Sequence, residues 1–206
     1  MNQPQYHTDR REFQIDRMIL FTDAVFAIAI TLLVIELHTP EIPENGTEKD
    51  FLIALAAMIP KFIGLTVSFF LIALYWFVHH RLFGWVINYT GKLIWLNIIF
   101  LFSIVLLPFS TAVYSEYSTT EHYSSLLTPY AVYVGNMIFI GVMNFLLLNY
   151  VFNPKNGVAE AIPEKYLIEN SKRQAFLFFS LLFSSSFLPP SFVIFFFLSE
   201  SPLLPQ

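Results

Sequence analysis

The chain has 206 residues, of which 56% are hydrophobic and only 13% are charged, and its mean hydropathy is +0.61. A water-soluble domain cannot bury that much apolar surface, so the composition indicates an integral membrane protein. The net charge of −4 and the scattered Lys and Arg residues give no sign of nucleic-acid binding. The absence of Cys excludes disulfides, cysteine-ligated zinc and iron–sulfur clusters. Because a membrane span needs roughly 20 residues, the length allows one domain of about six spans.

The first elements are a polar arm at residues 1–16 and an apolar run that predicts a membrane span at 17–37. No small-residue cleavage site precedes Pro40, so we interpret this run as a permanent span and not as a signal peptide. An acidic loop with two prolines ends it. The next apolar stretch, 51–80, is longer than a bilayer requires, so we expect its membrane portion to begin at Pro60, a favourable first-turn residue.

Two further spans are predicted at 92–113 and 126–152, separated by a short Ser/Thr/Glu loop. After a polar segment, a fifth span is predicted at 172–188, and Pro189-Pro190 then turns the chain. A sixth span at 190–206 is short and is interrupted by Glu200 and Pro202. The prediction is therefore an all-α, polytopic membrane domain covering 17–206, with about six spans.

The basic residues predict the orientation of these spans. Only Lys49 and Lys61 fall on one side, and the others fall on the opposite side: Arg10, Arg11, Arg17, Arg81, Lys92, Lys155, Lys165, Lys172 and Arg173. Because Lys and Arg concentrate in cytoplasmic loops, the N-terminus and the loops after the second and fourth spans are expected inside. The acidic loop after the first span then faces out.

The polar residues of the first span lie on different helix faces. Successive residues are rotated by about 100°, so one stripe contains Ile28, Thr31, Leu32 and Ile35, whereas Asp23 lies about 140° from Ile28. On periodicity alone, the stripe is an ordinary lipid-facing or packing surface. Asp23 requires a hydrogen-bond donor, because an ionisable group below the membrane surface is costly without a partner.

Donors for Asp23 are available near the inner end of the second span. The candidates are Trp76, His79, His80 and Arg81, with Arg17 as a further candidate on the same helix. We interpret the set as a structural polar clamp between the first two spans, in preference to a proton relay. A metal site at the two histidines is disfavoured because adjacent helical residues point about 100° apart. No nucleophile elbow, phosphate loop or paired carboxylates are present, so no catalytic residue is assigned and an enzyme is not expected.

Two motifs carry a resemblance to a known family. The first is Arg17-x-x-x-Phe21-Thr22-Asp23, followed by Thr31-Leu32-Leu33, and the second comprises Pro60-Lys61-Phe62, Ser68-Phe69 and Trp76-x-x-His79-His80-Arg81-Leu82-Phe83. In this order they resemble the RxxxFSD signature and the following landmark in prokaryotic homologues of the endosomal and lysosomal potassium channel, the transmembrane protein 175 family. Thr22 stands in place of the usual Ser and keeps the hydroxyl.

The resemblance implies a six-span subunit in the cell membrane and a homotetramer whose first helices line the pore. It implies a constriction at Ile28, further apolar layers at Leu32 and Ile35, and a polar layer at Thr31 that tunes selectivity. The expected partners are further copies of the chain, membrane lipids and permeant K⁺, with no cofactor and no bound metal. The clamp set is then Arg17, Phe21, Thr22, Asp23, Trp76, His79, His80 and Arg81.

The expected function is a potassium-selective channel without a carbonyl filter, because the sequence has no TVGYG-like segment. The main alternative is a proton-coupled transporter or proton pathway that uses Asp23 with His79 or His80. Such a transporter would show interrupted helices in matching halves, and the sequence shows no convincing repeat. A structural membrane assembly factor is a third possibility.

Overall fold

The computed structural model describes residues 8–118 and 126–160 and is entirely helical apart from loops and one isolated β-bridge. Four helical stretches in this part are long and apolar enough to cross a membrane: Arg10–Ile35, Glu48–Phe83, Gly91–Tyr117 and Leu127–Phe152. They confirm an all-α polytopic fold, and they overlap the first four predicted spans. The predicted spans at 172–188 and 190–206 lie outside the described residues.

The first two predicted spans differ in detail from what the structure contains. Helix α1, Thr8–Ile35, begins well before residue 17, so the second half of the polar arm is helical. The stretch predicted as one helix at 51–80 is two helices, α2 (Glu48–Ala57) and α3 (Ile59–Phe83). The break comes at Met58, because Pro60 has no N–H with which to continue the α2 hydrogen bonds. As expected, Pro60 occupies the first turn of the membrane-length helix.

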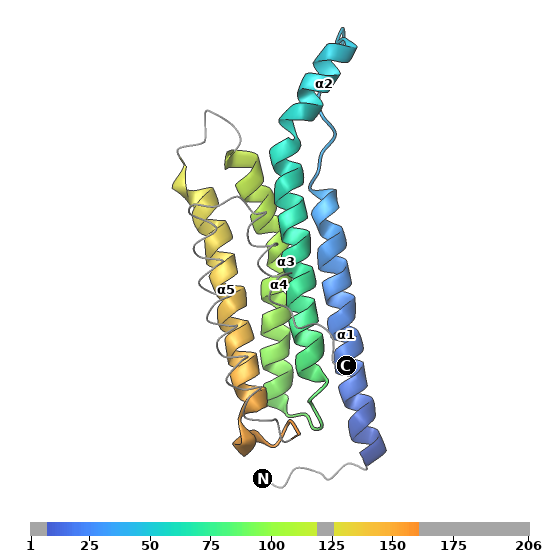
Figure 1. Cartoon of the computed structure of the whole chain (residues 1–206), viewed down its shortest axis with the longest axis vertical. Helices are drawn as coiled ribbons and strands as arrows, with labels where there is room; N and C mark the ends of the chain where they lie inside the picture. Colours follow the sequence, from blue (N-terminus) through green and yellow to red (C-terminus); the bar gives the residue numbers. More distant parts are fainter. Residues whose placement is uncertain (1–7, 119–125, 161–206) are drawn as a thin grey trace, which may run out of the picture. The chain divides into compact units, whose positions relative to one another are not determined.

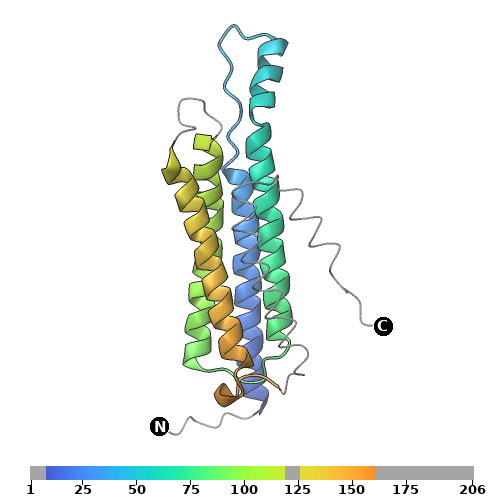
Figure 2. The ribbon, with the colours of Figure 1, turned by 60° about the vertical axis from the view of Figure 1, so that its left-hand side comes forward.

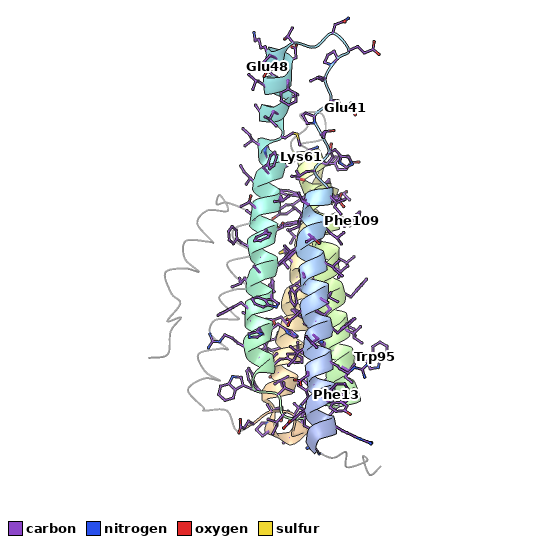
Figure 3. The ribbon with its side chains drawn as sticks, turned by 90° about the vertical axis from the view of Figure 1, so that its right-hand side faces the viewer. Phe13, Glu41, Glu48, Lys61, Trp95 and Phe109 are labelled. Atoms are coloured by element: carbon purple, nitrogen blue, oxygen red, sulfur yellow. The ribbon has the colours of Figure 1, made fainter. Side chains whose placement is uncertain are left out.

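Helix α2 projects beyond the ends of the other helices (Figures 1 and 2). Its first turn is held by a capping box, in which the Thr47 hydroxyl accepts from the Asp50 N–H at 3.4 Å and Asp50 Oδ2 accepts from the Thr47 N–H at 2.8 Å. Glu48 marks its start in Figure 3, whereas Lys61 lies at the beginning of α3. At about 1.5 Å per residue, α2 and α3 together exceed the roughly 30 Å hydrocarbon thickness.

Helix α4, Gly91–Ser118, and helix α5, Leu127–Phe152, complete the described bundle and pack extensively on each other. Helix α4 also contacts α1 and α3, which makes it the central helix of the described part (Figure 1). Large side chains fill the interior at less than 2% exposure: Phe26, Ile72, Leu93, Phe100, Ile104, Leu107, Ile140 and Leu147. Because lipid tails are as apolar as these side chains, the packing stabilises the bundle through van der Waals contacts and not through the removal of apolar surface from water.

A short clasp, defined here as the pairing of residues 85–88 with residues 158–160, joins the α3–α4 loop to the segment after α5. After α5, a single 3-10 turn (η1, Pro154–Asn156) ends at Gly157, whose φ of 59° suits a glycine. The following residues return to the α3–α4 loop, where Ile87 N–H donates to Val158 at 3.0 Å and Glu160 N–H donates to Trp85 at 3.0 Å. Val86 and Val158 are buried beneath this pairing.

Candidate functional site

The predicted stripe of α1 lies on the face that the other described helices leave uncovered. The Ile28 side chain is 56% exposed and that of Ile35 is 68% exposed. Thr31 is exposed and Leu32 is half-buried at the edge of this face. The opposite face packs against α3 and α4 through residues that are at most 3% exposed: Thr22, Phe26, Ala29 and Leu33. Among the described residues, helix α1 therefore has one buried face and one uncovered apolar face, called here the free face of α1.

The free face of α1 is broader than the predicted stripe. Val34, which lies about 120° from Ile28 around the helix, is also 59% exposed. Leu20 and Phe21 extend the apolar surface toward the N-terminal end of the helix. The exposed fractions thus distinguish the stripe from the buried face of α1, but they do not show whether Ile28 or Val34 would face a pore.

The Thr31 hydroxyl has a defined local geometry on this face. Its hydrogen is donated to the Ile28 carbonyl oxygen one turn earlier, at 2.8 Å. This i−3 bond is common for Thr in helices and turns the remaining lone pairs of the oxygen outward. An exposed Thr31 oxygen in this state is an acceptor, which is the polarity that a hydrated cation recognises.

Three helices meet at a buried polar junction, defined here as Thr22, Asn97 and His79. Asn97 Nδ2 donates to the Thr22 hydroxyl oxygen at 2.9 Å, and the Thr22 hydroxyl donates to the Met18 carbonyl at 2.9 Å. Asn97 Oδ1 and His79 Nε2 are 2.8 Å apart. Since the Asn97 oxygen can only accept, His79 donates from Nε2. The junction links α1, α4 and α3 through groups that are at most 3% exposed.

Aromatic rings enclose the imidazole of the junction. The His79 ring stacks on Phe83, with centroids 4.2 Å apart, and lies nearly parallel to Phe100 at 5.6 Å. Phe26 contacts the same ring from α1 at 5.9 Å. These apolar neighbours exclude water, so the loss of one hydrogen bond here would leave a buried polar group without a partner.

Asp23 finds its donor outside the junction, on the surface between α1 and α3. Trp76 Nε1 donates to Asp23 Oδ1 at 2.8 Å, and the Trp76 ring stacks on His80 with centroids 5.4 Å apart. The carboxylate therefore points toward α3, as the helix geometry predicted. Arg17, the other candidate donor, lies over the Phe13 ring instead, 5.9 Å from its centroid.

The predicted clamp thus divides into separate parts. Thr22 and His79 belong to the buried junction, whereas Asp23, Trp76 and His80 form a more exposed pair of contacts. Arg81 lies over Phe77 at 5.8 Å, and Phe21 is 56% exposed on the free face of α1. In the described ranges, no group of three or more His, Asp or Glu residues is arranged to hold a metal ion.

Sequence reasoning missed Asn97, the residue that joins the two motifs. It lies in the middle of an apolar stretch, and an amide at such a position signals an interhelical hydrogen bond. Polar residues within apolar stretches also form two other buried contacts between helices. Ser68 and Thr111 hydroxyls are 2.7 Å apart across α3 and α4, and Asn136 of α5 contacts Ser110 of α4.

Comparison with known proteins places these features in a family context. Residues 17–108 match the family described as endosomal/lysosomal potassium channel TMEM175. A potassium channel of Chryseobacterium sp. (strain P1-3) is 29% identical over 181 residues, which covers 86% of this chain and 85% of that protein. The endosomal/lysosomal proton channel TMEM175 of Gallus gallus is 35% identical over 112 residues, covering 52% of this chain and 22% of that protein.

A solved structure shares the fold. The crystal structure of a lysosomal potassium-selective channel TMEM175 homolog from Chamaesiphon minutus matches with a TM-score of 0.67 and 26% identity, covering 91% of this chain and 99% of that one. The sequence matches include both motifs that carry the resemblance, and the fold agrees with them. The chain is therefore an integral membrane protein that is similar in sequence and in fold to the TMEM175 potassium channel family.

Proposed function

We propose that the chain is the subunit of a potassium-selective channel, in which the first helices of a homotetramer surround the ion pathway. The observation that carries this proposal is the free apolar face of α1, on which Ile28 and Ile35 are more than half exposed. The interior of the described bundle offers no comparable surface, because large apolar side chains fill it. An aqueous path along α1 therefore requires other copies of the same helix.

The side chains of the free face suit a narrow pore without a carbonyl filter. A ring of Ile28 side chains would exclude water when narrow and hydrate after a small outward movement of α1. Leu32 and Ile35 would add apolar layers toward the outside. The outward-facing Thr31 oxygen would partly replace lost hydration, and K⁺ releases its water more readily than Na⁺.

The distribution of charge supports a cytoplasmic N-terminus. Within the described chain, Lys49 and Lys61 lie at the α2 end of the bundle, and most basic residues lie at the opposite end: Arg10, Arg11, Arg17, Arg81, Lys92 and Lys155. By the positive-inside rule, that second end faces the cytoplasm. The acidic loop before α2 would then stand at the outer mouth of a pore in the cell membrane.

A proton pathway is the second candidate function, favoured by the name of the Gallus gallus relative, a proton channel. In the described chain, Asp23 bonds Trp76 while His79 bonds Asn97, so the two titratable groups belong to different sets of contacts. The contact geometry supports structural roles for both. If the protein conducts protons, a pH gradient alone should acidify the interior of liposomes that contain it. The rate of this acidification should fall when Asp23 is replaced.

The decisive experiment replaces Ile28 with Asn and records the channel in planar bilayers with mixed K⁺ and Na⁺. A ring of amides would lower the barrier to hydrated ions, so we expect the conductance to rise and the preference for K⁺ to fall. Phe102→Asn is the matched control, because Phe102 is also 56% exposed but belongs to α4. If both variants behave alike, or if Ile28→Asn has no effect, α1 does not line the pathway.

The Val34→Asn variant determines which part of the free face points to the pore. We expect a clearly smaller effect than at Ile28, because the two residues lie about 120° apart on the helix. A larger effect at Val34 than at Ile28 would mean that the side of α1 carrying Val34 lines the pore. Native mass measurement in nanodiscs tests the assembly, and a monomer that conducts would contradict the shared pore.

A further inference from the structure

Helix α4 is continuous, but Pro108 removes one of its backbone hydrogen bonds, and the parts of the helix on either side of this break have different attachments. Proline has no N–H to donate to the Ile104 carbonyl, and its ring displaces that carbonyl. On the inner side of this break, Asn97 ties α4 to α1 through Thr22 and to α3 through His79. On the outer side, α4 is tied to α3, through the Ser68–Thr111 hydroxyl pair and an ion pair between Lys61 and Glu116. A bend at Pro108 would therefore move the outer attachment relative to the inner one.

The side chain of Asn136 in α5 lies against this break. In the amide orientation that pairs donors with acceptors, Nδ2 donates to the Ser103 carbonyl at 3.1 Å. Oδ1 accepts from the Leu107 N–H at 3.2 Å and from the Ser110 hydroxyl at 3.0 Å. Ser103 and Leu107 are an i, i+4 pair in the turn that precedes Pro108, so one amide of α5 bonds both backbone groups of that turn. Asn136 is 8% exposed, so water does not compete freely for these groups.

The break lies at the depth of the α1 stripe. Helices α1 and α4 run in the same direction, and the Asn97–Thr22 bond fixes their relative height. The contact between the Phe26 and Phe100 rings, with centroids 6.1 Å apart, maintains that alignment one turn farther out. With about 1.5 Å per residue in both helices, Ser103 matches the height of Ile28, and Pro108 that of Leu33.

We propose that Asn136 is a positioning residue that braces the interrupted helix α4 behind the pore-lining stripe and thereby sets how readily the pore opens. The proposal rests on the proposed channel function. The brace keeps the two halves of α4 aligned, so the outer half of α1 has a rigid support at the height of the constriction. Without the brace, α4 bends at Pro108, the support yields, and the constriction widens more readily.

A double-mutant cycle tests the brace independently of conduction. Asn136→Leu should lower the ratio of folded to unfolded protein by about tenfold in thermal unfolding, because buried backbone groups lose partners. Pro108→Ala supplies an N–H that can bond the Ile104 carbonyl and removes the ring that strains this turn. The turn then depends less on the Asn136 amide, so the same change should cost less than about twofold in that background. Asn144→Leu, a buried asparagine two turns along α5, is the control and should not depend on Pro108. Equal costs of Asn136→Leu in both backgrounds would overturn the proposal.

Single-channel recording tests the positioning role. Asn136→Leu should raise the open probability by about tenfold, and the Pro108→Ala background should remove this increase. If Asn136→Leu does not assemble, Asn136→Ala replaces it, and assembly recovered only with Pro108→Ala supports the brace. An unchanged open probability would overturn the proposed effect of Asn136 on pore opening, even if the stability measurements show that Asn136 and Pro108 are coupled. If the unmodified protein does not conduct, the proposed function fails, and the role behind the pore fails with it, while the stability cycle still decides whether the brace exists.

Discussion

Helices α1 and α4 are both apolar, membrane-length helices, yet they expose their residues in opposite ways. Helix α4 contacts α1, α3 and α5 and contributes Leu93, Phe100 and Ile104 to the core. Helix α1 buries a single face and leaves Ile28 and Ile35 uncovered. Because lipid covers apolar surface as well as protein does, hydrophobicity does not distinguish these roles. Buried polar contacts do, since they show where one helix is fixed to another.

The largest effect is expected at the polar junction, where the two helices are joined. Asn97→Leu removes the partner of His79 and one of the two hydrogen bonds of Thr22, which keeps its bond to Met18. Leaving the buried imidazole N–H unpaired costs about 2 kcal/mol. We expect a correspondingly lower midpoint in thermal unfolding of the purified protein. Ile99→Leu, on the partly exposed side of the same helix, is the control. Similar stability of the two variants would mean that the junction does not fix α1 to α4.

A smaller effect is expected at Asp23, on the edge between the buried and the free face of α1. Asn retains an oxygen that can accept from Trp76, so Asp23→Asn loses only the charge assistance of the bond, about 1 kcal/mol. Unfolding and ion preference should be measured on the same preparation. We expect stability to change and the preference of K⁺ over Na⁺ to remain. Normal stability with lost preference would identify Asp23 as a pore ligand.

The outer ion pair should matter less. Glu116 has a side chain that is 58% exposed, and solvent screening limits such pairs to about 0.5 kcal/mol. Lys61→Met should therefore shift thermal unfolding only slightly, and added salt should shift the unmodified protein by a similar amount. A loss as large as that of Asn97→Leu would show that the outer half of α4 depends on this contact.

The smallest effect on stability is expected at Ile28, where the effect on conduction should be greatest. Substitutions on a surface that the subunit leaves free change stability by less than about 0.5 kcal/mol. Ile28→Asn should accordingly unfold at nearly the same temperature as the unmodified subunit while its currents change. A strong loss of stability would indicate that Ile28 is packed in the assembly, and not exposed to the ion pathway.

Much of the fold could be predicted from the sequence because a membrane span is specified by length and composition. The boundaries were less accurate: the charged residues before Arg17 did not reveal that α1 begins at Thr8, since helices extend readily into the aqueous phase. Helical geometry oriented Asp23 toward α3, but it could not select Trp76 over Arg17, because that choice depends on the rotation and height of a neighbouring helix.

The central contacts of the site could not be predicted from local patterns. Asn97 and Asn136 are single amides in apolar stretches, and their partners lie far away in the sequence. Each was visible as a polar residue that needs a partner, but the identity of the partner depends on how the helices pack. The pore-lining role of Ile28 depends on other copies of the chain and stays a prediction.

The clasp at the inner ends has a consequence for how the protein is made. Residues 158–160 leave the ribosome only after α5, yet they pair with residues 85–88 between α3 and α4. The backbone groups of the α3–α4 loop therefore bond water until α4 and α5 have been inserted in the membrane. Closure of the clasp is thus a late step in biogenesis, and a chain that stops after α4 cannot form it.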